Sequence, residues 1–187
     1  MTAAEQHDQT SSMNYALAPC SLGIAVVAAV RGRLAAFWFG DSPEAVRARF
    51  LARHPRAQEA AGDPLTAALL TKAVEIIERP HLPWGEPLAL VGTPFQLQVW
   101  AALREIPPGE TASYAQIARR IGRASATRAV AAACAANPIA IVVPCHRVIR
   151  SDGALSGYAG GVWRKRVLLE REAAARLDAA ARLDAAA

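Results

Sequence analysis

Residues 113–136 read SYAQIARRIGRASATRAVAAACAA, and this stretch determines the architecture expected for the second half of the chain. Ser113 begins a capping box that opens a helix, and Gly122 ends that helix. A further helix is expected over 126–136, with Ser125 as its cap. Two short helices joined by a turn that contains glycine, with arginine on the second, form a helix-turn-helix pattern. Ordinary helical hairpins look similar, so the pattern alone does not establish DNA binding.

The second of these helices, ATRAVAAACAA, has one long polar side chain, that of Arg128, among small residues. A helix that packs in a protein core normally carries leucine or other large apolar residues on its buried face. A helix of alanines can approach another surface closely, and Arg128 would then project toward that surface. The alternative is an alanine-rich core helix with one solvated arginine.

The first half of the chain predicts a small sheet backed by helices, and no residue pattern in it indicates chemistry. Two apolar runs flank Arg31-Gly32 and predict a hairpin. Farther along, Ser42-Pro43 and Asp63-Pro64 each place a capping residue before a proline, as at the first turn of a helix. The expected elements are strands at 22–30 and 33–39, helices that begin at Pro43 and Pro64, a loop at 80–87 and a run at 88–91 that could add a third strand.

The remaining elements of the second half follow from similar signals. A capping box at Thr93 opens a helix, which ends before Pro107-Pro108-Gly109. The last helix carries Trp163, Val167 and Leu168 at positions expected to face inward. Between them are expected a buried strand at 139–143 and a glycine-rich loop at 151–161.

The chain is therefore expected to be an α/β (α+β) protein in which a mostly helical domain with a helix-turn-helix follows a small sheet-and-helix domain. The expected parts are a disordered tail at 1–13, an α/β domain at 14–91, a second domain at 92–174 and an alanine-rich tail at 175–187.

Composition excludes several classes of protein. Cys20, Cys134 and Cys145 have no paired spacing, which favours a reducing compartment over a disulfide framework. The histidines do not cluster with the cysteines, so no structural zinc is expected. No apolar run approaches the ~18 residues of a membrane span, and the polar start does not resemble a secretory signal. We expect a cytoplasmic protein with no membrane attachment.

Positive charge is concentrated in one part of the chain, although the net charge is only +5. Between residues 111 and 169 the single acid is Asp152, whereas the rest of the chain is net negative. A charge run is usually a solvated face, but a segment this one-sided favours a polyanionic partner. Its nine basic residues are Arg119, Arg120, Arg123, Arg128, Arg147, Arg150, Arg164, Lys165 and Arg166.

A cysteine and a histidine are adjacent in PCHRV (144–148). Only the thiolate of a cysteine attacks, and with an ordinary pKa of about 8.5 the thiol is mostly protonated at neutral pH. His146 can accept this proton, and a carboxylate behind the imidazole can stabilise the resulting charge. Glu172 shares the buried face of the last helix, where an acid needs a partner. A buried, unreactive Cys145 is the alternative, because adjacent side chains on a strand point to opposite faces.

Several motifs of the second half resemble one family. PCHRVI (144–149), followed by GALSGYAGG (153–161), is similar to the active-site region of the O6-alkylguanine-DNA alkyltransferases, or methylated-DNA–protein-cysteine methyltransferases. The resemblance covers Gly92–Glu172, and the bacterial Ogt proteins and the C-terminal half of Ada are the most similar members. It implies a ribonuclease H-like first domain. It also implies a suicidal, single-turnover transfer of the alkyl group of O6-alkylguanine, with O4-methylthymine as a second candidate substrate.

The resemblance implies a role for each residue of the catalytic group. Cys145 matches the nucleophile, which becomes a permanent thioether, and His146 matches the residue that removes its proton through a water. Glu172 matches the carboxylate partner of this histidine, and Asn137 matches an asparagine that supports the turn before the cysteine. Tyr114 matches a tyrosine that hydrogen-bonds guanine N3 and so stabilises the leaving base. No cofactor and no metal are implied.

The resemblance also implies how DNA is bound. The target nucleotide is flipped out of the duplex, and Arg128 matches an arginine that occupies the vacated place. The helix-turn-helix lies in the minor groove, which suits small side chains and carries little sequence information. The expected partner is double-stranded DNA that contains O6-alkylguanine, bound by a monomer. DNA contacts are expected at Ser113, Arg123, Ala126, Thr127, Arg128, Ala129 and Arg147, and the substrate pocket at Val148, Tyr158, Ala159 and Gly160.

Other classes of function fit parts of the sequence. A DNA-binding regulator would use the helix-turn-helix, but the sequence has no cysteine-rich metal-binding module such as Ada carries. Relatives that bind alkylated DNA without repairing it have lost the cysteine, whereas Cys145 is present. A Cys-His hydrolase would need an oxyanion site and turnover, and it leaves Arg128 and the basic stretch unexplained. Repair of alkylated DNA is the leading hypothesis.

Overall fold

The computed structural model describes residues 12–155 and 157–184. The chain divides into two compact units. The first consists of the chain up to Val74 together with residues 86–89, and the second consists of residues 75–85 and the chain from Leu90 onward. Most of the tail expected at 1–13, and the last three residues of the tail expected at 175–187, lie outside the described residues.

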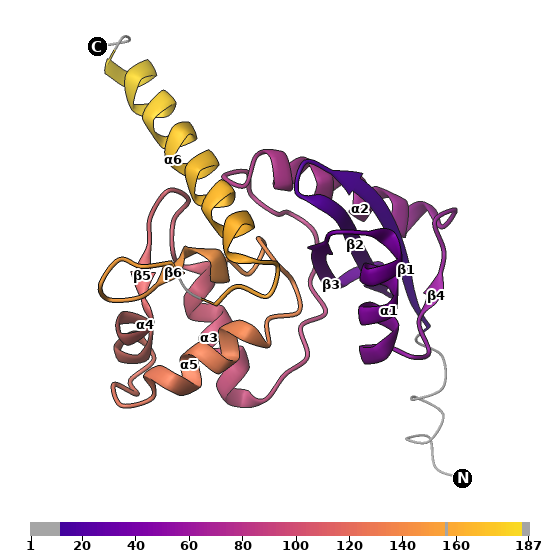
Figure 1. Cartoon of the computed structure of the whole chain (residues 1–187), viewed down its shortest axis with the longest axis horizontal. Coiled ribbons are helices and arrows are strands. Elements are labelled where there is room, and N and C mark those ends of the chain that lie inside the picture. Colours follow the sequence, from indigo (N-terminus) through magenta and orange to yellow (C-terminus); the bar gives the residue numbers. More distant parts are fainter. Residues whose placement is uncertain (1–11, 156, 185–187) are drawn as a thin grey trace. The chain divides into compact units, whose positions relative to one another are not determined.

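The first unit is built on a four-stranded sheet in the order β3-β2-β1-β4 (Figure 1). The strands are β1 (Met13–Cys20), β2 (Gly23–Val30), β3 (Arg33–Gly40) and β4 (Gln58–Glu59). β2 and β3 form the predicted antiparallel hairpin, and its two-residue turn has φ of 52° at Arg31 and 70° at Gly32. Positive φ at both positions matches the turn to the twist of the strands.

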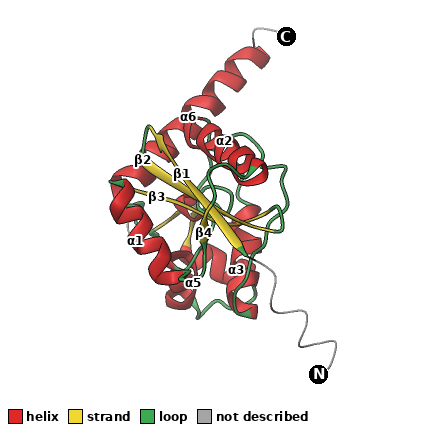
Figure 2. Ribbon diagram, turned by 90° about the vertical axis from the view of Figure 1, so that its right-hand side faces the viewer, coloured by secondary structure: helices red, strands yellow, loops and turns green. Residues whose placement is uncertain are grey.

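Helices follow the sheet at the predicted prolines. In α1 (Pro43–Arg53) the Ser42 side chain caps the first turn, and α2 (Pro64–Glu78) begins after Asp63, whose carboxylate accepts from the Thr66 N–H at 2.9 Å. Phe50 of α1 belongs to a core cluster with residues of all three long strands. Figure 2 shows strands β1 to β4 together with α1 and α2. The predicted sheet-and-helix first half is confirmed.

The second unit is mostly helical. Its elements are α3 (Pro94–Arg104), β5 (Ala112–Ser113), α4 (Tyr114–Arg120), α5 (Thr127–Ala135), the 3₁₀ turn η1 (Cys145–Arg147), β6 (Val148–Ile149) and α6 (Val162–Asp184). Both predicted capping boxes form, with reciprocal hydrogen bonds at Thr93 and at Ser113. Gly122 ends α4 with φ of 72°, and α4 and α5 pack together as the predicted helical pair. None of the helices in the described ranges is long and apolar enough to span a bilayer.

Three predicted details of the second unit are wrong. Residues 139–143 are mostly buried but form turns rather than a strand, apart from a single β-bridge residue at Ile139. Ser125 does not cap α5, since Ala126 occupies the cap position and no side chain bonds the first turn. Trp163 is 49% exposed, because Arg164 and Lys165 occupy the buried face of α6.

The first unit differs from expectation in two segments, β1 and the run at 88–91. β1, which pairs with the whole length of β2, is not among the strands expected from the sequence. Proline and two alanines in β1 hide its alternation, although Tyr15 and Ala16 are buried. The run at 88–91 does not form a third strand. It contributes one isolated parallel bridge, from Leu88 to Leu34.

Candidate active site

Cys145 lies at the start of η1, directly after a buried turn. Cys145 is 9% exposed and His146 is completely buried. The Cys145 N–H donates to the carbonyl of Val143 at 2.8 Å, so the backbone reverses immediately before the cysteine. Because the chain is not extended here, the adjacent thiol and imidazole are not forced onto opposite faces. The chain therefore turns before Cys145, as a cooperating pair requires.

Asn137 holds this turn. Its side-chain nitrogen donates to the carbonyl of Val143 at 2.7 Å and to Sγ of Cys145 at 3.2 Å, and its oxygen accepts from the Ile139 N–H at 3.0 Å. Ile141 has φ of 66°, a conformation that a β-branched residue rarely adopts. Such strain persists only where surrounding contacts impose it, and the Asn137 hydrogen bonds supply those contacts.

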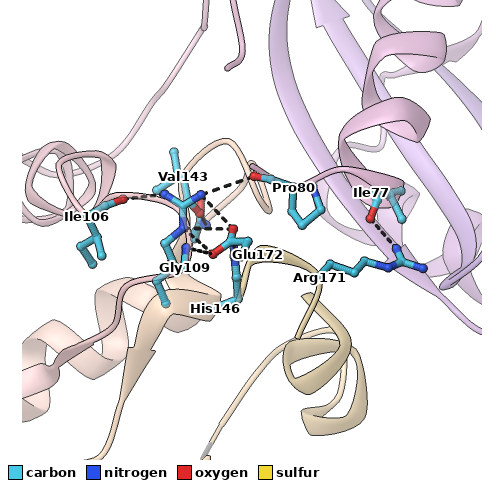
Figure 3. A network of polar contacts seen from close by, with 10 residues as sticks. Ile77, Pro80, Ile106, Gly109, Val143, His146, Arg171 and Glu172 are labelled. Carbon is cyan, nitrogen blue, oxygen red and sulfur yellow. Dashed lines mark hydrogen bonds and ion pairs between the residues drawn. The ribbon is translucent and has the colours of Figure 1, made fainter. Parts of the chain in front are cut away.

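Glu172 reaches the histidine from α6. Nε2 of His146 lies 2.8 Å from Oε1 of Glu172, and both side chains are completely buried. Oε2 accepts from the Gly109 N–H at 3.1 Å. Figure 3 shows Glu172 in a network of polar contacts with His146 and Gly109. The acid predicted to lie buried on the last helix therefore has the partner that the sequence suggested.

Arg147 is not an exposed DNA contact, which corrects the sequence-based expectation. It is 7% exposed, and its Nε lies 3.1 Å from each oxygen of Glu172 while Nη2 lies 2.8 Å from Oε1. The rest of the guanidinium donates to the carbonyls of Ile106 and Pro80, which are joined to this network by dashed lines in Figure 3. Its planar donors are used inside the protein, so none is presented to a phosphate.

The charges of this network favour a neutral histidine beside an ionised glutamate. Burial would raise the pKa of Glu172, but hydrogen bonds and charges from His146 and Arg147 outweigh it and lower the pKa to about 2. Burial lowers the pKa of His146, against the opposing effect of Glu172. Because Nε2 carries the hydrogen toward the carboxylate, Nδ1 is the ring nitrogen that can accept a proton. Nδ1 is buried and has no hydrogen-bond partner within the described ranges.

Lys165 is a site residue that the sequence analysis did not select. It is completely buried, and Nζ donates to the carbonyl of Val148 at 2.6 Å. Burial raises the pKa of Cys145, whereas the Asn137 hydrogen bond and the Lys165 charge act in the opposite direction. The lysine therefore favours the thiolate. Its position seven residues before Glu172, on the same helical face, is the sequence signal that could have found it.

The other predicted DNA contacts lie on or beside the helical pair. Tyr114, which was predicted as a catalytic residue, is the first residue of α4 and is half-buried. The Ser113 hydroxyl accepts from the Gln116 N–H at 3.1 Å as the cap of α4. Exposed are Arg123, Arg128 and Ala129, and half-buried are Ser113, Ala126 and Thr127.

The predicted pocket residues lie on two segments next to the cysteine. Val148 is buried in β6 and pairs with Ala112 of β5. Tyr158, Ala159 and Gly160 belong to a turn in which the Gly161 N–H donates to the Tyr158 carbonyl at 2.9 Å. Burial raises the pKa of Tyr158 well above its usual value, so its hydroxyl stays protonated.

Comparison with known proteins agrees with this geometry. Residues 94–174 match the family model described as 6-O-methylguanine DNA methyltransferase, DNA binding domain. Over 162 residues the chain is 45% identical to the bifunctional transcriptional activator/DNA repair enzyme Ada of Escherichia coli, covering 87% of this chain and 46% of Ada. Over 81 residues it is 62% identical to the methylated-DNA–protein-cysteine methyltransferase of Salmonella typhimurium, covering 43% of this chain and 47% of that protein. The chain thus spans about half the length of these curated relatives.

Solved structures cover more of the chain. The crystal structure of the O6-methylguanine methyltransferase of Mycobacterium tuberculosis matches with a TM-score of 0.71 and 36% identity, covering 87% of this chain and 93% of that one. The structure of the M. tuberculosis OGT in complex with DNA matches with a TM-score of 0.69 and 34% identity, covering 86% and 93%. The fold is that of an Ogt/Ada-type alkyltransferase. This chain belongs to the family of the methylated-DNA–protein-cysteine methyltransferases.

Proposed function

We propose that this protein repairs DNA by moving the alkyl group of an O6-alkylguanine to Sγ of Cys145, once and irreversibly. The observation that carries the proposal is a buried thiol, hydrogen-bonded by Asn137, next to a neutral histidine held by an ionised glutamate. This arrangement can activate a nucleophile but provides no route to regenerate a thioether. Names of relatives such as methylated-DNA–protein-cysteine methyltransferase support the same activity.

In the proposed step His146 takes the thiol proton at Nδ1, directly or through a water. The Cys145 thiolate attacks the carbon of the alkyl group, so that an S–C bond forms while the C–O6 bond breaks. The electron pair of the C–O6 bond remains on guanine, and a proton returns to the base to give neutral guanine. Tyr114 would donate to N3 and lower the charge that develops on the leaving base.

The DNA is proposed to bind through its minor groove to α4 and α5. The exposed positions Arg128 and Ala129 suit this role, because a small side chain beside a long cation permits close approach to a narrow groove. The buried thiol requires that the damaged nucleotide leave the stack, at a cost of a few kcal/mol. Arg128 would fill the vacated place. A monomer is sufficient for these contacts, and O4-methylthymine is a second candidate substrate.

Intact-mass spectrometry after incubation with a duplex containing one O6-methylguanine tests the proposal. We expect each protein molecule to gain one methyl group in place of a proton, located at Cys145 by peptide mapping and absent in Cys145→Ala. Cys134→Ala is the matched control, since burial raises the pKa of Cys134 to about 12 and leaves it unreactive. An unchanged mass in a folded protein that binds the duplex would refute repair and favour a regulatory or damage-binding role.

A further inference from the structure

The turn at residues 158–161 is held by the first turn of α6. Nη1 of Arg164 donates to the carbonyl of Gly160 at 2.6 Å. Arg164 is only 4% exposed, and its Cζ lies 4.4 Å from the centroid of the Trp163 ring. The guanidinium is therefore fixed both by a backbone carbonyl of the turn and by the face of an indole ring.

Helix stability does not explain a buried arginine at this position. The first turn of α6 has no acidic residue, and the positive end of a helix disfavours cations. Burial of a cation is unfavourable as well, unless hydrogen bonds compensate for the lost water. Arg164 and Lys165 are nevertheless both buried, and both donate to carbonyls outside the helix, at Gly160 and Val148. These two carbonyls belong to the two segments expected to line the substrate pocket.

The neighbouring glycine and tryptophan complete the arrangement. Gly161 has φ of 94°, and a Cβ atom there would meet Cδ1 of Trp163 at 3.4 Å and Nε1 at 3.5 Å. Trp163 is half-exposed and contributes little to the core, but its ring covers the Arg164 guanidinium. An exposed aromatic side chain on a helix is thus explained by its contact with the arginine.

We propose that Arg164, stacked on Trp163, is a positioning residue that holds the 158–161 turn as the wall of the substrate pocket. The inference rests on the proposed alkyl transfer and names a determinant of that same site. Arg164 would act through the Gly160 backbone, so that Tyr158 and Ala159 keep their places beside a flipped base. Displacement of such positioning groups by about 1 Å can slow a reaction on the order of 100-fold.

The test compares the full-length protein with Arg164→Ala in three measurements. These are alkyl transfer from a duplex with O6-methylguanine, affinity for an undamaged duplex, and alkylation of Cys145 by iodoacetamide, a small reagent that needs no pocket wall. We expect transfer to slow by about 10- to 100-fold, while the other two quantities change by less than about two-fold. Trp163→Ala should show a smaller loss of the same kind, and Trp163→Phe, which retains a ring face, should restore it. Arg182→Ala, an exposed arginine of the same helix, is the matched control.

Two results of the rate measurements would overturn the inference. One is a transfer rate in Arg164→Ala within about two-fold of the wild type, and the other is an equal fall in the iodoacetamide rate, which would indicate general damage to the site. Hydrogen exchange of the Gly161 amide provides a readout that does not depend on the reaction. Arg164→Ala should accelerate this exchange. Unchanged exchange would refute the proposal that Arg164 holds the 158–161 turn, even if the wild-type protein transferred no alkyl group. Absence of transfer by the wild type would refute the proposed function alone.

Discussion

Glu172 accepts hydrogen bonds from three groups of the second unit: the His146 ring, the Arg147 guanidinium and the Gly109 amide. A carboxylate bonded in this way is ionised over the whole working range of pH, consistent with its pKa of about 2. A fixed negative charge behind the imidazole stabilises the proton that His146 would take from Cys145. The same carboxylate is the counter-ion of a buried arginine, so it serves both the chemistry and the fold.

We expect Glu172→Gln to lower both stability and the rate of alkyl transfer. The amide has nearly the same shape but no charge, so Arg147 would remain buried without its counter-ion. Loss of one partner of a buried pair is expected to lower the free energy of unfolding by about 3–5 kcal/mol. Urea denaturation measures this change, with Glu170→Gln, exposed on the same helix, as control. Wild-type stability in Glu172→Gln would contradict the assigned pairing.

The same network predicts that the protein loses stability in acid. The pKa of His146 is lowered on folding, so unfolding takes up a proton once the pH falls below the ordinary value of about 6.5. The pKa of Glu172 is lowered as well, to about 2, so a further loss begins below the ordinary value of about 4.3 and continues toward the folded value. The urea midpoint should therefore fall as the pH is lowered from 7. Glu172→Gln should lack the part of the decline below about pH 4.3, and an equally steep decline in that variant would assign it to other groups.

At the scale of the elements, the sequence predicted what local signals determine. The caps at Thr93 and Ser113 need partners only three residues away, and both formed as predicted. The hairpin at Arg31-Gly32 is equally local. By contrast, the Arg147 contacts to Pro80 and Glu172 join residues far apart in sequence. No periodicity in the sequence encodes such a contact, which is why Arg147 was predicted to bind DNA.

The segment before Cys145 shows a second limit of prediction from the sequence. Its apolar residues are buried as a strand's would be, and apolarity alone does not distinguish a strand from a buried turn. The turn depends on the Asn137 side chain and on a left-handed Ile141, neither of which has a propensity signal. Resemblance to a family identified Asn137, whereas the residue pattern did not.

We expect Asn137→Ala to loosen this turn and to slow alkyl transfer. Three hydrogen bonds disappear, which leaves the Ile139 amide unpaired and the Val143 carbonyl with only the Cys145 N–H, and destabilises the protein by about 1–3 kcal/mol. Asn137→Asp keeps the acceptor for the Ile139 amide but loses both donors and places a negative charge beside Sγ. Its reaction with iodoacetamide should therefore be slower than that of Asn137→Ala at the same pH. A rate in Asn137→Ala equal to that of the wild type would show that the donor to Sγ does not stabilise the thiolate.

At the scale of the whole molecule, only part of the positive charge of the basic stretch lies at the surface. Arg147, Arg164 and Lys165 are buried and are used inside the second unit. Arg150 is exposed but pairs with Asp152 at 3.0 Å. The six exposed cations of the stretch are Arg119, Arg120, Arg123, Arg128, Arg150 and Arg166. They set the largest number of phosphates that this stretch can neutralise.

This bound predicts the salt dependence of duplex binding. Each neutralised phosphate contributes about −0.9 to the slope of log K against log salt concentration, so six give about −5. We expect a slope shallower than this value for an undamaged duplex, measured by fluorescence anisotropy. Arg123→Gln should make the slope shallower by about 1 and weaken binding regardless of sequence, because a phosphate contact carries no base information. Arg56→Gln, exposed in the first unit, should leave the slope unchanged. A slope steeper than about −5 would require cations from outside the basic stretch, and a changed slope in Arg56→Gln would show that the first unit supplies them.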